Sequence, residues 1–348
     1  MGDRLSSDDV RPEIADERTG PDPTAAGRRV LLLVNPSSGT GRGSGVGDTA
    51  LGSLRGLGHD VEPLVAADAA DAERLGRAAL TRTGEDRPDA VVVVGGDGVV
   101  HLGVNLVAGT GVPIGVVPAG TGNDIARAWG LPADPAAAVA AVDECLRLGT
   151  VRHVDAVDVE PLGRPEDPED SAGHGRRWVA GVTAAGFDAI VNERANLWRW
   201  PRGAARYNLA IARELPLFRP VPYRLVLDGQ EWATEGLLVA VATTSSYGGG
   251  MQIAPQAVCD DGLLDVVVVT PVPLHRFVRL FPRVYAGTHV ELDAVEVRRA
   301  RVVEVQVDAA GRHPRPIVAY GDGERLGRLP RRFSAVPGAV AVLTPTRT

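Results

Sequence analysis

The chain has 348 residues and a formal net charge of −7, and 44% of its residues are hydrophobic against 23% charged. This length favours two globular domains over one. Most of the negative charge lies in the first residues, and the nearly neutral charge of the remainder argues against nucleic acid as a partner. No apolar run approaches the roughly 20 residues of a membrane-spanning helix, and no signal peptide is visible, which predicts a soluble, cytoplasmic protein.

Two residue types are scarce. Cys145 and Cys259 are the only cysteines, too few for a disulfide framework or a thiolate metal site, and we expect both to be buried and reduced. The chain contains no lysine. Any contact to a phosphate must therefore come from backbone N–H groups, hydroxyls or arginines, because the lysine of a P-loop is missing.

The first part of the chain alternates strands with helices. Residues 1–27 are acidic and end in a proline-rich stretch, and we expect a disordered leader whose deletion leaves activity intact. Strands are predicted at 29–34, 59–65, 90–94 and 114–117, and helices before residue 57, at 69–81, at 99–108 and before residue 129. The alternation predicts an α/β domain with a parallel sheet over residues 28–148.

The pattern changes in residues 149–330 to strand-like segments separated by turns. These segments lie at 151–159, 177–183, 223–227, 235–243, 263–269, 294–307 and 316–319, and they predict a second, β-rich domain. Residues 161–176, dense in proline, glycine and charge, are interpreted as an exposed hairpin insertion. A last apolar strand at 336–343, within 331–345, is predicted to return to the first domain.

Three glycine-rich loops each follow a predicted strand of the first domain. They contain Asn35, Pro36, Ser37, Ser38 and Gly39, then Gly95, Gly96, Asp97 and Gly98, and then Gly120, Thr121, Gly122, Asn123 and Asp124. Ligands of open parallel sheets bind beyond the carboxyl ends of the strands, where glycines let the backbone approach a phosphate and unpaired N–H groups replace lysine as donors. One such loop is most often only a turn, but three at successive strand ends predict a shared phosphate site.

In order and spacing, these loops resemble the NPxSG, GGDGT and PxGTxNDxAR elements of the diacylglycerol kinase catalytic family. Residues 260–265 resemble the family's DGxLDV segment, and Asp322-Gly323-Glu324 resembles its late DGE. The resemblance runs from about residue 30 to the C-terminus. It implies an ATP-binding domain related to those of NAD kinases and 6-phosphofructokinases, and a β-sandwich that completes a lipid site at the cleft.

The resemblance also implies an activity, the transfer of a phosphate from Mg-ATP to the hydroxyl of diacylglycerol. The residues of the three loops would bind ATP, with Asp97 acting on the phosphates through Mg²⁺ and Asp124 as a structural or metal-network acid behind it. Glu324 would be the general base on the lipid hydroxyl, a role that suits a buried carboxylate. The partner would be a diacylglycerol-like lipid at the inner face of the membrane, and a homodimer is left open.

Both Asp-Gly segments of the second domain allow a simpler interpretation. By resemblance, Asp261 and the backbone carbonyls of Val258 and Leu263 would hold a second, structural Mg²⁺ that fixes the two domains relative to each other. An Asp-Gly turn ahead of a strand needs no ligand, however. Asp322-Gly323-Glu324 would likewise be a plain hairpin turn if the family resemblance were ignored.

The chain departs from the family pattern in and near its loops. Val99 replaces a threonine, His101 an asparagine and Leu102 an acid, and the family's threonine near the end of the second strand is missing from residues 65–67. His101 could form a hydrogen bond or lie on the helix surface without a role. These departures motivate one alternative, a catalytically silent nucleotide or lipid binder.

The lipid side is less sharply marked. Residues 187–218 mix aromatic residues with arginines, which suits a headgroup interface, although an ordinary amphipathic helix explains the same pattern. The glycine loop at 247–251 could line the cleft or serve only as a turn. Two further alternatives stay open: a kinase for a sphingoid base or another lipid alcohol, and an NAD kinase, which shares the GGDG loop.

Overall fold

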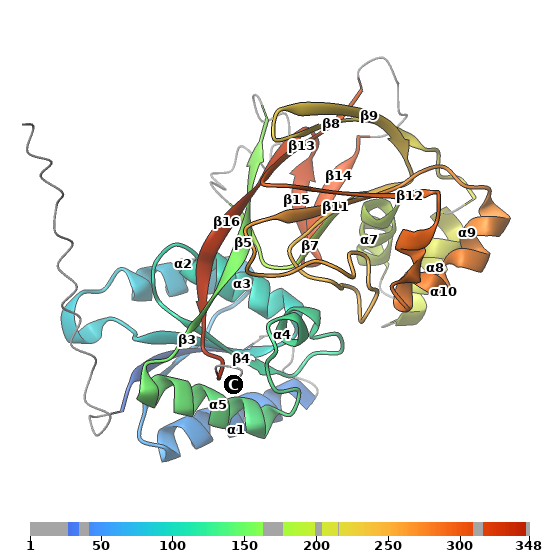
Figure 1. The fold of residues 1–348 in the computed structure, drawn as a ribbon. Helices are drawn as coiled ribbons and strands as arrows, with labels where there is room; N and C mark the ends of the chain where they lie inside the picture. Colours follow the sequence, from blue (N-terminus) through green and yellow to red (C-terminus); the bar gives the residue numbers. More distant parts are fainter. Residues whose placement is uncertain are drawn as a thin grey trace, which may run out of the picture.

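The computed structural model describes residues 27–34, 42–162, 177–198, 204–214, 216–308 and 316–345. They form two domains connected by a pair of long strands (Figure 1). The predicted leader, the first glycine-rich loop from Asn35 to Gly39, and most of the insertion at 161–176 lie outside the described residues.

The first domain has the predicted alternation of strands and helices. Its strands are β1 (Arg29–Val34), β2 (Asp60–Leu64), β3 (Ala90–Gly95) and β4 (Ile114–Pro118). Its helices are α1 (Arg42–Gly56), α2 (Ala69–Leu80), α3 (Asp97–Val107), α4 (Asp124–Ala128) and α5 (Pro135–Leu148), with a 3-10 turn η2 (Gly84–Asp86). The strands pair in parallel in the order β2-β1-β3-β4, so the predicted parallel sheet is confirmed.

The valine-rich strand β3 forms the centre of this sheet. All of its residues are buried, because helices cover both faces of the sheet, as parallel sheets require. Val100 and Val104 of α3 belong to the core on one face, and Leu54 of α1 and Val142 of α5 to the core on the other. Helix α5 was not among the predicted elements; it begins behind the N-cap Asp134 and ends at the left-handed Gly149 (φ 66°).

The second domain is built from antiparallel strands. They are β5 (Arg152–Pro161), β6 (Arg177–Val179), β7 (Val182–Gly186), β8 (Val221–Leu227), β9 (Gln230–Gly236), β10 (Leu238–Ala242), β11 (Leu264–Val269), β12 (Val295–Ala300), β13 (Val302–Val307), β14 (Val318–Gly321), β15 (Glu324–Arg328) and β16 (Arg331–Val342). One six-stranded sheet has the order β12-β11-β10-β7-β14-β15, and the remaining strands extend the sheet of the first domain. Apolar side chains from both sheets share one core, which confirms the sandwich-like second domain.

Several strands of the second domain have boundaries that differ from those predicted. The run predicted as one strand at 294–307 is two strands, β12 and β13, which belong to different sheets. The chain changes sheets at Arg301, whose N–H donates to the carboxylate of Asp228 (3.1 Å). The segment predicted at 177–183 likewise divides into β6 and β7, and strands β9 and β15 were not predicted.

Four helices lie together at one end of the second domain (Figure 1). They are α7 (Phe187–Leu197), α8 (Ala204–Glu214), α9 (Leu274–Leu280) and α10 (Pro282–Tyr285), followed by the 3-10 turn η3 (Thr288–Glu291). The ring of Phe187 packs against Phe218 and Phe277, with centroids 5.4 and 5.7 Å apart. Aromatic packing therefore joins segments that are far apart in the sequence.

Strand β16 joins the two domains. It pairs antiparallel with β5 and β13, and its end, Val342, pairs in parallel with Ile114 of β4, so one sheet of ten strands runs through both domains. The buried Asp155 of β5 accepts hydrogen bonds from Gly338 of β16 (2.9 Å) and from Gly262 (2.6 Å). Because the sheet is continuous, the boundaries proposed near residues 148 and 330 stay a prediction.

Two expectations about the whole chain can be compared with this fold. Cys145 and Cys259 are both free and buried, as predicted, and burial raises the pKa of each thiol. Among the residues described, no helix combines the length and apolar character needed to span a bilayer.

Candidate active site

The loops that follow β3 and β4 touch each other at the carboxyl edge of the sheet. The N–H of Ala119 donates to the carbonyl of Gly95 (2.9 Å). A methyl group added to Gly120 would lie 2.4 Å from the Cα atom of Gly96, closer than atoms can approach. Glycine is therefore required at position 120, and a Cβ atom on Gly96 would also be tight, 3.1 Å from the Cα atom of Gly120.

Asn123 closes the second of these loops. It has the left-handed backbone conformation (φ 55°), which asparagine tolerates better than most residues. Its side chain accepts a hydrogen bond from the N–H of Gly120 and donates one to the carbonyl of the same residue, both 3.0 Å long. Thr121, at the tip of the loop, remains exposed. The loop thus has a fixed shape and offers its tip to the cleft.

Asp97 is the first residue of helix α3. Its carboxylate accepts a hydrogen bond from the N–H of Ile125 at the start of α4 (3.1 Å). Burial raises the pKa of Asp97, the N–H groups of Ile125 and Asp124 oppose that shift, and the negative charges of Asp124 and Asp322 add to it. Burial and the neighbouring carboxylates therefore disfavour the charged form of Asp97.

Asp124 connects the two domains across the cleft. It is only 2% exposed, and its carboxylate accepts hydrogen bonds from the Ser246 hydroxyl (3.0 Å) and the Gly249 N–H (2.7 Å) of the second domain. Arg127, one turn later on α4, pairs with it at 2.8 Å. These hydrogen bonds hold the glycine loop at 247–251 against Asp124, at the wall of the cleft.

The Asp322-Gly323-Glu324 segment is both a hairpin turn and a wall of the cleft. Asp322 and Gly323 join β14 to β15 with positive φ angles of 53° and 90°. The Asp322 carboxylate accepts hydrogen bonds from the N–H groups of Ala180 (2.8 Å) and Gly181 (2.9 Å). The turn interpretation and the site interpretation therefore do not exclude each other.

His101 holds this hairpin to the first domain. Its Nδ1 lies 3.1 Å from Asp322 Oδ2, and its Nε2 lies 3.2 Å from Asn105 Nδ2. Asn105 exchanges two hydrogen bonds with the backbone of Trp178 (2.8 and 2.9 Å), which fixes its amide nitrogen toward His101. A carboxylate oxygen accepts, so Nδ1 of His101 is the donor in its hydrogen bond to Asp322. His101 is thus buried and bonded, and the surface-histidine interpretation is wrong.

Glu324 lies opposite the loop that contains Asp97. Its Oε1 is 3.5 Å from the position that a Cβ atom on Gly98 would occupy. The side chain is exposed, so the burial expected for a general base is not found. Hydrogen bonds of catalytic bases often tighten only when substrate binds.

Asp97, Asp124 and Asp322 line a cleft with an empty volume of about 1110 Å³, open solvent included. Its polar wall contains Asp97, Asp124, Ser246 and Asp322, together with Asp188 of α7. Val99, which replaces the family's threonine, is buried in the core and contributes no hydroxyl there. The cleft therefore combines carboxylates, a hydroxyl and glycine-rich backbone.

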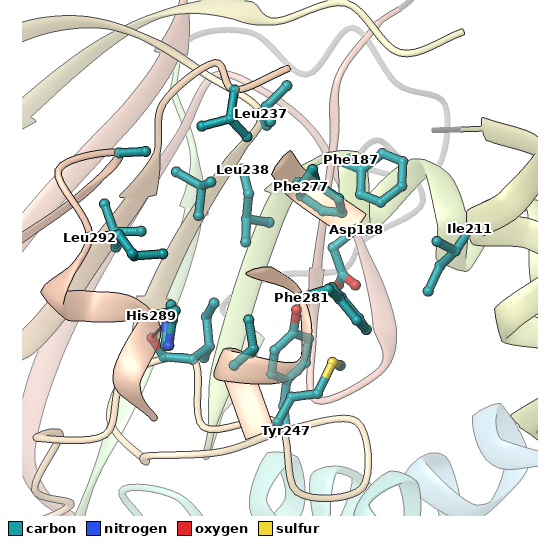
Figure 2. A pocket seen from close by; sticks show the side chains of 17 residues that line it. Phe187, Asp188, Ile211, Leu237, Leu238, Tyr247, Phe277, Phe281, His289 and Leu292 are labelled. Carbon is teal, nitrogen blue, oxygen red and sulfur yellow. Dashed lines mark hydrogen bonds between the residues drawn. The ribbon is translucent and has the colours of Figure 1, made fainter. Parts of the chain in front are cut away.

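An apolar pocket of about 830 Å³, open solvent included, adjoins the cleft. Figure 2 shows Phe187, Phe277 and Phe281 on one side of it and His289 and Leu292 on the other. The pocket and the cleft share five wall residues, which we call the neck: Asp188, Ile211, Tyr247, Met251 and Phe281. The two spaces are therefore neighbours with a common wall.

The neck carries one polar pair. The Tyr247 hydroxyl is hydrogen-bonded to the Asp188 carboxylate; burial, with this carboxylate as a second cause, raises the pKa of Tyr247 well above its ordinary value. The tyrosine therefore stays protonated and donates. Deeper in the pocket, Nε2 of His289 donates to the Ile253 carbonyl (3.1 Å), and burial lowers the pKa of His289. Both residues are neutral near pH 7, so the pocket beyond the neck carries no charge.

The predicted second metal site has a different arrangement. Asp261 is hydrogen-bonded to the Arg299 guanidinium and accepts from the N–H of Leu263 (3.1 Å). Val258 is 45% exposed. Within the described ranges, no three His, Cys, Asp or Glu side chains converge on a point that could hold a metal ion. A structural Mg²⁺ on Asp261, Val258 and Leu263 thus stays a prediction, and it would have to compete with Arg299.

The site residues that belong to contiguous motifs were predicted, whereas those that separate elements contribute one at a time were not. Asp188, Ser246 and the partner role of Asp322 had no distinguishing pattern around them. Only the position of Asp188, directly after the Gly186-Phe187 pair at a strand end, could have pointed to the site. The loop of Asn35 to Gly39 lies outside the described residues, so its place in the cleft stays a prediction.

Comparisons with known proteins match this architecture. A family model described as "Diacylglycerol kinase catalytic domain" matches residues 29–159, and one described as "YegS C-terminal NAD kinase beta sandwich-like domain" matches residues 181–344. A diacylglycerol kinase of Mycobacterium tuberculosis is 41% identical over 319 residues, covering 91% of this chain and 95% of the relative. A Stenotrophomonas maltophilia protein named "Probable lipid kinase YegS-like" is 29% identical, covering 85% and 90%.

A solved structure agrees at the level of the fold. The crystal structure of a diacylglycerol kinase from Bacillus anthracis superposes with a TM-score of 0.63 at 20% identity, covering 92% of this chain and 97% of that one. At this identity the likeness concerns the fold alone.

Proposed function

The chain belongs to the diacylglycerol kinase family of lipid kinases, and we propose that it transfers the γ-phosphate of ATP to the hydroxyl of a diacylglycerol, giving phosphatidic acid. The observation that carries the proposal is the junction of the acid-lined cleft with the apolar pocket. A kinase for a polar metabolite such as NAD has no use for an uncharged, aromatic-walled space next to its reacting groups. A lipid alcohol needs both spaces.

ATP would bind over the glycine loops of the first domain. Gly95, Gly96, Gly98, Gly120 and Thr121 would contact the phosphates through N–H groups and a hydroxyl, because the chain has no lysine. The residues Asn35, Pro36, Ser37, Ser38 and Gly39 would complete this surface. Asn123 would act indirectly, by holding the shape of its loop.

The residues present fit a divalent cation held mainly by the nucleotide. Mg²⁺ is commonly bound by one or two carboxylates together with substrate phosphates and waters, and Asp97 is a carboxylate whose pKa is raised by burial, with smaller contributions from the negative charges of Asp124 and Asp322. Asp97 would hold the ion, with Asp124 behind it. When bound, Mg²⁺ would neutralise the charge that develops on the transferred phosphate.

Glu324 would act as the general base. The lipid hydroxyl oxygen forms a bond to the γ-phosphorus, the bond from that phosphorus to the bridging oxygen of ATP breaks, and ADP leaves. The hydroxyl proton passes to the Glu324 carboxylate. The acceptor lipid would itself cover this exposed side chain, and such bases contribute roughly 10² to 10⁴ in rate.

The acyl part of the acceptor would enter the apolar pocket through the neck. Each buried methylene contributes about 0.8 kcal/mol, so even a short stretch of chain holds the lipid while its hydroxyl reaches the cleft. At the neck, the Asp188–Tyr247 pair would face the polar middle of the lipid, where hydroxyl and ester groups lie. A sphingoid base would place an amine there, which is the main chemical difference between the two acceptors.

The decisive experiment measures transfer of labelled γ-phosphate from Mg-ATP to diacylglycerol in mixed micelles. We expect labelled phosphatidic acid from the wild type, and loss of it in Glu324→Gln and Asp97→Ala while both variants stay folded. A parallel panel offers sphingosine, ceramide, monoacylglycerol and NAD. Faster transfer to another lipid alcohol would replace the acceptor but keep the kinase; ATP binding without transfer to any acceptor would instead favour a silent binder.

A further inference from the structure

The helices that wall the apolar pocket also present a face to solvent. Phe187, Phe277 and Phe281 of α7, α9 and the turn into α10 line the pocket. On the other side of the same layer, Arg276, Val278 and Arg279 of α9 are exposed. Helix α9 thus lines the pocket through Phe277 and presents Arg276, Val278 and Arg279 to solvent, in the group of helices at this end of the domain (Figure 1).

The segment after α8 belongs to the same layer. Phe218 and Phe277 both pack against Phe187, which brings residues 216–219 close to α9. Leu217 beside Phe218 is 67% exposed and Val278 beside Phe277 is 59% exposed. Two large apolar side chains, one in the turn after α8 and one on α9, are therefore largely exposed to water.

Unpaired positive charge surrounds these apolar residues. We define the basic helical face as Arg213, Leu217, Arg219, Arg276, Val278 and Arg279. None of its four arginines forms an ion pair with another described residue. The nearby acids are occupied instead: Glu214 pairs with Arg194 at 2.7 Å, and Glu291 with Arg283 at 3.0 Å.

The charge of this region is opposite to that of the whole chain. Residues 187–219 contain six arginines and three acids, and residues 272–291 contain three arginines and one acid, although the chain as a whole has a net charge of −7. The sequence of these two segments therefore carries an excess of positive charge, and the four arginines of the basic helical face belong to it. Arginine interspersed with exposed apolar side chains is the composition of helices that lie at the interface of anionic membranes.

We propose that the basic helical face docks the enzyme on a lipid bilayer with anionic headgroups, with Leu217 and Val278 inserted and the four arginines on the phosphates. The inference rests on the proposed function, because a lipid acceptor has to come from a bilayer. Docking through this layer places the membrane on the outer side of the same helices whose inner side lines the acyl pocket. The acceptor then travels a short apolar path and never crosses open water.

The combination of arginines with exposed apolar side chains favours a bilayer over a protein partner. An acidic protein patch would pair with the arginines but would leave Leu217 and Val278 to be buried by a matching apolar surface. A bilayer satisfies both, since the headgroups carry the charge and the acyl region accepts the apolar side chains. The attraction is additive over the arginines and is weakened by salt.

The test measures binding of the full-length protein to vesicles by co-sedimentation without ATP. One set of vesicles contains phosphatidylcholine alone and the other equal parts of phosphatidylcholine and phosphatidylglycerol. We expect the wild type to bind the second set, and Arg276→Gln/Arg279→Gln to bind it about 30-fold more weakly, because each arginine near such a surface contributes about 1 kcal/mol. Arg276→Lys/Arg279→Lys should retain most of the binding, and Val278→Asp should weaken it at every salt concentration.

Two controls separate docking from folding and from catalysis. Arg74→Gln/Arg87→Gln removes two exposed arginines from the first domain and should bind like the wild type. Activity toward a short-chain diacylglycerol presented as monomers should be equal in the wild type and in Arg276→Gln/Arg279→Gln, whereas phosphorylation of diacylglycerol in anionic vesicles should fall with the binding.

Two results would overturn the docking surface without touching the kinase assignment. One is a wild type that phosphorylates lipid monomers but does not bind anionic vesicles more tightly than neutral ones. The other is equal vesicle binding by the wild type and both α9 double variants, Gln and Lys alike. Failure of the kinase itself would appear separately, as absence of transfer to monomeric lipid, since the sedimentation measurement requires no catalysis.

Discussion

The cleft and the apolar pocket share a wall, but the chemistry of their linings differs. In the cleft, Asp97, Asp124 and Asp322 are oriented by backbone N–H groups and raise the local density of negative charge. In the pocket beyond the neck, aromatic and aliphatic side chains offer apolar surface and no charge. The difference implies that changes in the cleft act on the rate of transfer, whereas changes in the pocket act on the choice of acceptor.

The largest expected effect is that of changing Asp97 in the cleft. Asp97→Asn removes the carboxylate proposed to hold the metal, so we expect kcat to fall roughly 10³-fold. Stability should behave differently, because the raised pKa of Asp97 means that its ionised form is disfavoured in the folded protein. The stability linked to its protonated form is complete below the ordinary aspartate pKa and is lost as the pH rises through the raised pKa.

Thermal unfolding without Mg²⁺ or nucleotide checks this second part. The asparagine variant should be at least as stable as the wild type at about pH 8, and its advantage should shrink toward about pH 4. A variant that is inactive and also less stable at the higher pH would show that Asp97 is a structural residue.

Asp124→Ala tests whether the cleft is also a joint between the domains. The buried carboxylate loses its hydrogen bonds from Ser246 and Gly249, and bonds to a charged group contribute about 1.5 to 3 kcal/mol each. We expect the free energy of unfolding in urea to fall by about 3 kcal/mol. Arg127→Ala is the matched control; its guanidinium is largely exposed, so its loss should cost less than about 1 kcal/mol. Equal losses of unfolding free energy in the two variants would show that the hydrogen bonds of Asp124 do not hold the two domains together.

On the pocket side, Leu292→Trp should alter selectivity and leave the chemistry intact. Leu292 lines the pocket on the side opposite Phe187 (Figure 2), so a larger side chain shortens the space for an acyl chain. We expect kcat/KM for a long-chain diacylglycerol to fall by about 10 to 100-fold, and that for a short-chain one to stay nearly constant. Leu292→Ala should not shift the preference toward short chains. A parallel loss for both acceptors would mean that the chain binds outside this pocket.

The smallest expected effect concerns the link between the two walls of the cleft. His101→Leu removes the donor to Asp322 and loosens the hairpin that presents Glu324, so we expect kcat to fall about tenfold with the KM for ATP unchanged. His101→Asn keeps a donor on the same face of α3 and should recover part of the rate. Full activity in the leucine variant would show that the backbone bonds of Asp322 suffice to hold the hairpin.

The two regions also differ in how far the sequence predicts them. The loops after β3 and β4 were found because phosphate binding depends on local backbone shape, which a short contiguous motif such as Gly95-Gly96-Asp97-Gly98 determines. Their meeting followed from the rule for parallel sheets. The contact between Gly96 and Gly120 adds the physical reason for the glycines.

The pocket could not be predicted in this way. Phe187, Phe218 and Phe277 come from segments far apart in the chain, and an aromatic residue at any one of these positions has nothing to distinguish it from ordinary core. The strand run at 294–307 failed for a related reason, since alternation does not reveal that the chain changes sheets at Arg301. Where a site is assembled from single residues of many elements, tertiary packing decides it.

The return of β16 to β4 has a consequence for the order in which the chain is made. Strands β1 to β4 are synthesised early, yet the strand that completes their sheet, β16, spans Arg331–Val342 of a 348-residue chain. Multidomain proteins usually fold their N-terminal domain first, while the remainder is still on the ribosome. In this protein β4 keeps an open edge until β16 has been made. A ribosome that stops short of residue 331 therefore leaves two unfinished domains instead of one complete domain and one missing.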